Sequence, residues 1–145
     1  MSKNALIGAT GVYYVASELS RRGLIALPTI RNTKGYDIIV ANMAGTGHAN
    51  IDVKASLKCV DFFPAPPSDR VCTGPNDYYV LVRWLEKDRR FEAFMLTGAE
   101  AKEEVIWYER ERQVEGKSPF AGIHVGKWAK GRDALWKERW KTWNL

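Results

Sequence analysis

The chain has 145 residues, a net charge of +5 and a hydrophobic fraction of 46%, which is the size and composition of one globular domain. No apolar run approaches the roughly 20 residues of a membrane-spanning helix, so we expect no membrane partner. The first residues lack the apolar region of a signal peptide, and two cysteines, Cys59 and Cys72, are too few for a disulfide framework. We therefore expect a cytoplasmic protein with free thiols.

The first half of the chain predicts a helix, a short strand and a β-hairpin. Apolar side chains recur at helical spacing before Gly23, and two later segments rich in β-branched residues flank a glycine-containing turn. The expected elements are a helix over residues 4–22 and strands over residues 24–27, 36–42 and 50–56. Four prolines then predict an irregular stretch over residues 57–76.

The second half predicts two more strands and two more helices. They are expected as strands over residues 78–85 and 91–96 and helices over residues 98–113 and 132–143. We interpret the acidic residues of the first of these helices, such as Glu104, as a solvent-exposed face. The order of elements predicts a single α/β domain over residues 1–145, with a mixed central sheet flanked by helices.

Tryptophans mark the last predicted helix. Trp136, Trp140 and Trp143 recur at helical spacing, which is typical of a helix that packs on a sheet. Stacking of these rings on nucleic-acid bases is the alternative. We favour packing, with the basic residues on the other faces of the helix left for phosphate contacts.

Basic residues are concentrated at the two ends of the chain. Residues 1–35 carry five Lys or Arg and one Glu, residues 117–145 carry seven basic and two acidic residues, and the middle carries ten basic and fourteen acidic residues. This pattern favours a polyanionic partner, most commonly nucleic acid, although charge of this size also serves solubility. The expected phosphate contacts are Arg21, Arg22, Arg31, Lys34, Lys137 and Lys141.

The predicted hairpin carries the residues with the clearest chemistry. Side chains alternate along a strand, so Asp52 and Lys54 share one face while Ile51 and Val53 point to the core. Asp37 opens the neighbouring strand. Pairing of the two strands would bring the two aspartates together near one end of the hairpin.

Two neighbouring carboxylates repel each other unless a divalent cation lies between them. Mg²⁺ prefers about six oxygen ligands, and Asp37, Asp52 and the carbonyl of Val53 would supply three, with water and a phosphate oxygen completing the set. Such an ion activates water and phosphate, and Lys54 would orient the water or stabilise the transition state of phosphodiester hydrolysis. The alternative is a weak surface ion pair between Asp52 and Lys54.

Three segments resemble the PD-(D/E)xK nuclease superfamily, which has the restriction-endonuclease-like fold. They cover residues 13–23, 33–40 and 50–56, and the likeness is nearest to small prokaryotic proteins with Holliday-junction-resolvase-like architecture. The resemblance implies an αβββαβ core around a mixed sheet, with Mg²⁺ or alternatively Mn²⁺ as cofactor, DNA as substrate and a homodimer as a common assembly. It assigns the two acids and the lysine of the family motif to Asp37, Asp52 and Lys54.

The chain departs from this family at one position of the first helix. Many relatives carry a glutamate about eleven residues before the glycine that ends the helix, where this chain has Val12. Two hypotheses follow: a Mg²⁺-dependent DNA endonuclease, or a non-catalytic nucleic-acid-binding or protein-interaction module with the same fold. RNA is an alternative substrate. His48 and His124 show no metal-ligand spacing and receive no role.

Overall fold

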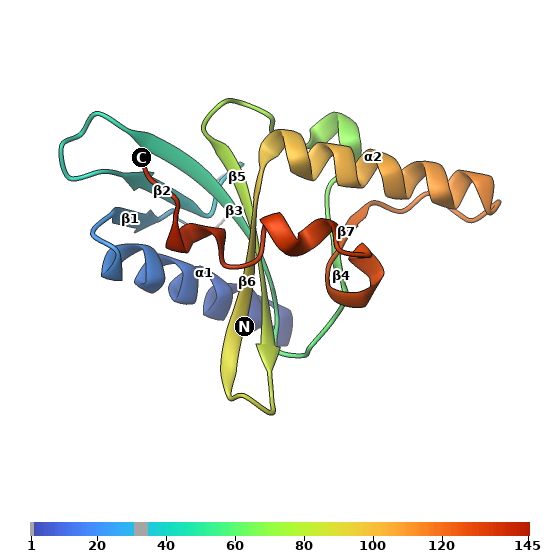
Figure 1. Ribbon diagram of the computed structural model, residues 1–145, viewed down its shortest axis with the longest axis horizontal. Helices are drawn as coiled ribbons and strands as arrows, with labels where there is room; N and C mark the ends of the chain where they lie inside the picture. Colours follow the sequence, from blue (N-terminus) through green and yellow to red (C-terminus); the bar gives the residue numbers. More distant parts are fainter. Residues whose placement is uncertain (1, 31–34) are drawn as a thin grey trace.

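The computed structural model describes residues 2–30 and 35–145, and Figure 1 shows the arrangement of the elements. The helices and strands are α1 (Lys3–Arg21), β1 (Ile25–Pro28), β2 (Ile38–Ala41), β3 (His48–Ser56), β4 (Phe62–Pro64), β5 (Asp77–Leu85), β6 (Arg90–Thr97), α2 (Gly98–Val114) and β7 (Gly122–His124). Short 3₁₀ turns lie at Ser68–Arg70, Gly126–Ala129, Arg132–Leu135 and Arg139–Lys141. Neither α-helix in the described part of the chain is long and apolar enough to cross a membrane.

The central sheet has five strands in the order β1-β2-β3-β5-β6. Neighbouring strands are antiparallel except for β3 and β5, which run parallel. This mixed sheet, with helices packed on it, confirms the predicted class, a mixed central sheet flanked by helices. The order of elements in the described chain differs from the αβββαβ core that the resemblance implies, because no α-helix lies between β3 and β5 and α2 follows β6. The predicted hairpin of β2 and β3 is also confirmed, with Ile38 opposite Ile51.

The two faces of the sheet support two separate hydrophobic clusters. Val53 and its neighbour Val80 belong to the cluster that contains Val15 and Leu19 of α1. Tyr79, which pairs with Asp52, belongs to the cluster that contains Ala101 and Val105 of α2. Because paired residues point to the same side of a sheet, Asp52 lies on the face that α2 covers.

Helix α1 approaches β3 closely at a glycine. A Cβ atom on Gly11 would lie 2.4 Å from Cβ of Ala55 and 3.3 Å from a methyl carbon of Val53. The helix ends as predicted before Gly23, whose φ of +85° is unfavourable for other residues. The helix therefore depends on one glycine for contact with β3 and on another for its termination.

A second, two-stranded sheet interrupts the stretch that was predicted to be irregular. Strands β4 and β7 are antiparallel, with Phe63 opposite Ile123, and both residues are buried in the cluster under α2. Three residues are too few to carry a strand signal of their own, and the partner strand is distant in sequence. Cys59 and Cys72, at either end of this region, are free thiols.

The prediction of a helix over residues 132–143 is wrong. The segment forms 3₁₀ turns, and its backbone bonds to the edge strand: Met95 N–H donates to the carbonyl of Trp136, and Glu138 N–H donates to the carbonyl of Ala93, each at 2.8 Å. The unpaired edge of β6 offers these groups, so the segment follows the edge, as Figure 1 shows in red. The expected burial of Trp136 and Trp140 is confirmed, at 5% and 1% exposed.

Acidic residues of helix α2 bind the C-terminal segment of the chain. Thr97 and Glu100 form a capping box at its start, and Glu100 also pairs with Arg139 at 2.7 Å. Glu104 was predicted to be exposed but is buried, because Arg132 binds its carboxylate at 3.0 Å. These pairs fix the C-terminal segment against α2.

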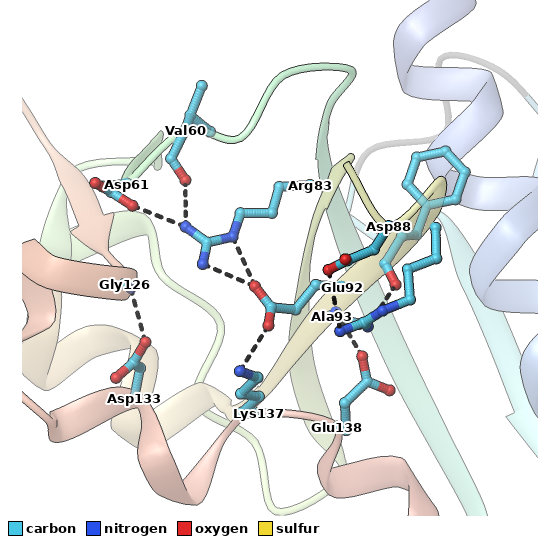
Figure 2. A network of polar contacts seen from close by, with 12 residues as sticks. Val60, Asp61, Arg83, Asp88, Glu92, Ala93, Gly126, Asp133, Lys137 and Glu138 are labelled. Atoms are coloured by element: carbon cyan, nitrogen blue, oxygen red, sulfur yellow. Dashed lines mark hydrogen bonds and ion pairs between the residues drawn. The ribbon is translucent and has the colours of Figure 1, made fainter. Parts of the chain in front are cut away.

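A buried polar network joins β5 and β6 to two other parts of the chain (Figure 2). Arg83 donates to Glu92 at 2.8 Å, to Asp61 at 2.8 Å and to the carbonyl of Val60 at 2.9 Å. Lys137 approaches the other oxygen of Glu92 at 2.7 Å. Burial raises the pKa of Glu92, but hydrogen bonds from Lys137 and Arg83 outweigh it and lower the pKa below its ordinary value.

Candidate active site

Strand β3 brings Asp52 and Lys54 together on one face of the sheet. The ammonium of Lys54 lies 2.5 Å from Oδ1 of Asp52, which confirms that the two side chains point the same way. The Asp52 side chain is 17% exposed and that of Lys54 is 33% exposed. The pair is therefore half-buried, and the interpretation as a solvated surface pair does not fit.

Asp37 reaches the same strand from the residue before β2. Its Oδ2 accepts a 2.7 Å hydrogen bond from the backbone N–H of Val53, and its own N–H donates to the carbonyl of Ile51 at 2.9 Å. Thr29 holds the Asp37 backbone in turn, because its N–H donates to the Asp37 carbonyl at 2.9 Å. The Asp37 carboxylate is thus fixed beside the strand that carries Asp52 and Lys54.

The pKa of Asp52 is set mainly by its burial. Burial raises the pKa of Asp52, Lys54 opposes this shift, the charge of Asp37 adds to it, and the net result is a raised pKa. Oδ1 of Asp52 is buried, and the ammonium of Lys54 is the group that compensates its charge. The site therefore holds a largely buried carboxylate that is balanced by a lysine.

Asp37, Asp52 and the carbonyl of Val53 fit a hard divalent cation, for which they could supply part of the ligand set. Because the N–H and C=O of one strand residue point to the same neighbouring strand, the carbonyl of Val53 faces the side on which Asp37 lies. Within residues 2–30 and 35–145, no group of three or more His, Cys, Asp or Glu could hold a metal ion. Two carboxylates with water ligands suit Mg²⁺, which keeps several waters, better than Zn²⁺, which is usually enclosed by three or four side chains.

A second polar cluster, which the sequence did not reveal, lies next to Asp52. Asp77 is 7% exposed and accepts hydrogen bonds from Asn50 at 3.0 Å and from the N–H of Gly74 at 2.8 Å. Burial raises the pKa of Asp77, but hydrogen bonds from Asn50, Tyr36 and Gly74 outweigh it and lower the pKa. Tyr36 directly precedes Asp37, so its bond to Asp77 anchors that segment. Asn50 lies on the same face of β3 as Asp52, and this alternation is the one sequence signal that could have indicated the cluster.

Helix α1 supplies no carboxylate to the site. Val12 packs half-buried against the cluster between α1 and the sheet. The one acid of the helix, Glu18, accepts from Arg21 at 3.1 Å and from Arg22 at 2.5 Å. Those bonds outweigh the effect of burial and lower the pKa of Glu18. Val12 therefore contributes to the packing of α1 on the sheet and offers no oxygen ligand.

Some of the predicted phosphate contacts form ion pairs within the protein, and others are exposed to solvent. Arg22 binds Glu18 and lies 5.4 Å from the ring centroid of Trp140, and Lys137 binds Glu92, so both serve the fold. Arg21 is 67% exposed beside Glu18, and Lys141 is exposed in the last 3₁₀ turn. Arg31 and Lys34 lie outside the described residues.

The two histidines lie away from the carboxylate pair. His48 is exposed at the start of β3, with Nε2 3.1 Å from Nδ2 of Asn76. His124 is packed among aromatic rings near the end of α2.

No protein-family model matches the chain, and no curated protein matches its sequence. Among solved structures, the bacterial homing endonuclease I-Ssp6803I is similar, with a TM-score of 0.56 and 11% sequence identity. The similarity covers 98% of this chain and 91% of that chain. At this level of identity the similarity shows that the two proteins share a fold, over nearly their whole lengths.

Proposed function

We propose that this protein is a metal-dependent DNA endonuclease with Asp37, Asp52 and Lys54 as its active site. The observation that carries the proposal is the convergence of the two aspartates and the lysine on residues 52–54 of β3. The shared fold with a homing endonuclease supports it, as does the resemblance of the hairpin to the PD-(D/E)xK motif.

In this proposal Asp37, Asp52 and the carbonyl of Val53 hold Mg²⁺, with Mn²⁺ as a substitute. The ion would supply positive charge that polarises the phosphate and lowers the pKa of water. Lys54 orients the attacking water or neutralises the negative charge that builds up on the phosphate in the transition state. The bond from Val53 N–H keeps the Asp37 carboxylate oriented, and the Tyr36–Asp77 contact keeps its backbone in place.

One observation favours a second candidate, a non-catalytic nucleic-acid-binding module. Val12 offers no oxygen where the nuclease family often has a glutamate, and Lys54 already neutralises Asp52. In this second candidate Asp37, Asp52 and Lys54 only stabilise the hairpin. RNA is a further substrate to include in any test.

A cleavage assay separates these candidates. Supercoiled, linear, branched and single-stranded DNA, and RNA, are incubated with the protein in Mg²⁺, in Mn²⁺ and in EDTA. We expect cleavage with metal and none with EDTA. Asp52→Asn should abolish cleavage without loss of DNA binding, and Lys54→Ala should slow it roughly 10²–10⁴-fold. Lys58→Ala, at the next lysine along the chain and exposed, is the matched control and should cleave normally.

Absence of cleavage by the wild-type protein on every substrate, together with retained binding, would establish the non-catalytic candidate instead.

A further inference from the structure

A second candidate site lies in an aromatic cavity beyond the sheet. The cavity has a volume of about 700 Å³ and lies between the C-terminal half of α2, β4, β7 and the turn at Gly126–Ala129. None of the residues Asp37, Asp52 and Lys54 lines it. Its aromatic lining consists of Phe62, Trp107, Tyr108, His124 and Trp128.

His124 is the centre of this aromatic cluster. Its ring centroid lies 4.9 Å from that of Tyr108, 5.1 Å from Phe62, 5.7 Å from Trp107 and 6.5 Å from Trp128. Burial and the nearby Arg132 lower the pKa of His124, against a smaller opposing effect of Glu104. The imidazole is therefore neutral at physiological pH, and the cavity presents uncharged aromatic surfaces.

Trp128 is the most accessible ring of the cluster. It is 56% exposed, although a tryptophan is a costly residue to leave in water. It stands in the short turn at Gly126–Ala129, and the ammonium of Lys127 lies 5.6 Å from its ring centroid. An exposed ring at the mouth of a cavity offers a flat face to a flat ligand.

Basic groups surround the mouth of the cavity. Arg112, Lys117, Lys127 and Lys130 line it, together with Asp61, Glu111 and Glu115. Two of the three carboxylates are neutralised within the protein, Asp61 by Arg83 at 2.8 Å and Glu115 by Lys117 at 2.5 Å. The remaining charge is positive, which opposes a cationic ligand and favours an anionic one.

We propose that this cavity binds a base of single-stranded nucleic acid, with Trp128 as the stacking surface and Lys127 and Lys130 beside the phosphates. Aromatic faces for bases and cations for the backbone are what sequence-independent binding of single strands requires. The identity of the polymer rests on the proposed nuclease function. The two sites share one side of the sheet, because Arg83, which binds the cavity residue Asp61, lies on the same face as Lys54.

Binding of a short fluorescein-labelled oligothymidylate, measured by anisotropy in EDTA, tests the proposal without any dependence on catalysis. Trp128→Ala should weaken binding at least about five-fold, the lower end of the loss for one stacked base. The wild type should bind an abasic strand of the same length more weakly than it binds oligothymidylate. The wild type and Trp128→Ala should bind the abasic strand equally well. Leu135→Ala, which removes another exposed apolar side chain outside the cavity, should change nothing.

Lys127→Ala should weaken binding of both strands, because its contribution is to the backbone. The proposal is overturned if Trp128→Ala leaves oligothymidylate binding unchanged, or if the abasic strand binds the wild type as tightly as the base-bearing one. A protein that stacks on oligothymidylate but cleaves nothing would keep this inference and remove the nuclease proposal. Cleavage without base-dependent binding would do the reverse.

Discussion

The backbone N–H of Val53 donates a 2.7 Å hydrogen bond to the Asp37 carboxylate, at the point where β2 begins and its ladder with β3 ends. The bond continues the strand pairing through a side chain, so the orientation of Asp37 depends on the register of the hairpin. A carboxylate held in this way, beside a second, largely buried carboxylate that is paired with Lys54, is the arrangement on which the proposed metal site rests.

Metal binding should stabilise the folded protein through the two aspartates. Wild-type protein should show a higher melting temperature in Mg²⁺ or Mn²⁺ than in EDTA, because a ligand that binds only the folded state stabilises it by mass action. Asp37→Asn and Asp52→Asn should each lose this increase. Asp69→Asn, at an exposed aspartate in the Ser68–Arg70 turn, should keep it. An increase that survives in all three variants would place the ion elsewhere.

The charge of Asp52 should destabilise the metal-free protein in a pH-dependent way. Because burial and Asp37 raise its pKa in the folded state above the ordinary 3.8, the folded protein binds more protons and loses stability as the pH rises from about 3.8 through the raised value. Asp52→Asn carries no charge and escapes this loss. Denaturant unfolding in EDTA should therefore show a stability advantage of Asp52→Asn that is small at low pH and grows toward neutral pH. An advantage that is constant with pH would mean that the charge carries no energetic penalty.

The two glycines of the first half of α1 should respond oppositely to alanine. Gly11→Ala should destabilise the protein by roughly 1–3 kcal/mol, the usual cost of overpacking, because the added Cβ would overlap Ala55. Gly8→Ala meets nothing within 4 Å and should stabilise the protein by about 0.5–1 kcal/mol through helix propensity. Urea denaturation measures both. Equal effects of the two substitutions would mean that α1 does not approach β3 at Gly11.

The Arg83–Glu92 and Arg90–Asp88 ion pairs in Figure 2 should differ greatly in how much they contribute to the stability of the protein. Glu92 has a side chain that is 3% exposed, so Glu92→Gln should cost roughly 1.5–3 kcal/mol, because Arg83 keeps Asp61 but loses its charged partner in the buried part of the network. Asp88 pairs with Arg90 at 4.0 Å with both side chains more than half exposed, so Asp88→Asn should cost less than about 0.5 kcal/mol. Thermal unfolding of the two variants gives the comparison, and similar costs would contradict the burial of the network.

The hairpin could be predicted from sequence because its signals are local. Alternation along residues 50–56 fixes which side chains share a face, and the short turn fixes that Asp37 and Asp52 lie on adjoining strands. The resemblance of these same residues to a nuclease motif assigned their roles, and that assignment stays a prediction. Local signals therefore sufficed for the candidate active site itself.

Features that depend on distant partners could not be predicted in this way. The segment around Trp140 has the periodicity of a helix, but the open edge of β6 competes for its backbone, and Glu138 adopts a φ of +51° that breaks a helix. The pairing of β4 with β7 leaves no local pattern. The bond between Tyr36 and Asp77 likewise joins residues that only the parallel pairing of β3 and β5 brings together.

The most direct test of the central claim is a crystal structure of the protein soaked in Mn²⁺, with the ion located from its anomalous scattering. The account predicts one peak within coordination distance of carboxylate oxygens of both Asp37 and Asp52, and no peak there in crystals of Asp52→Asn. A wild-type crystal with these carboxylates free of lattice contacts and no peak between them, or with the peak bound at other residues, would contradict it.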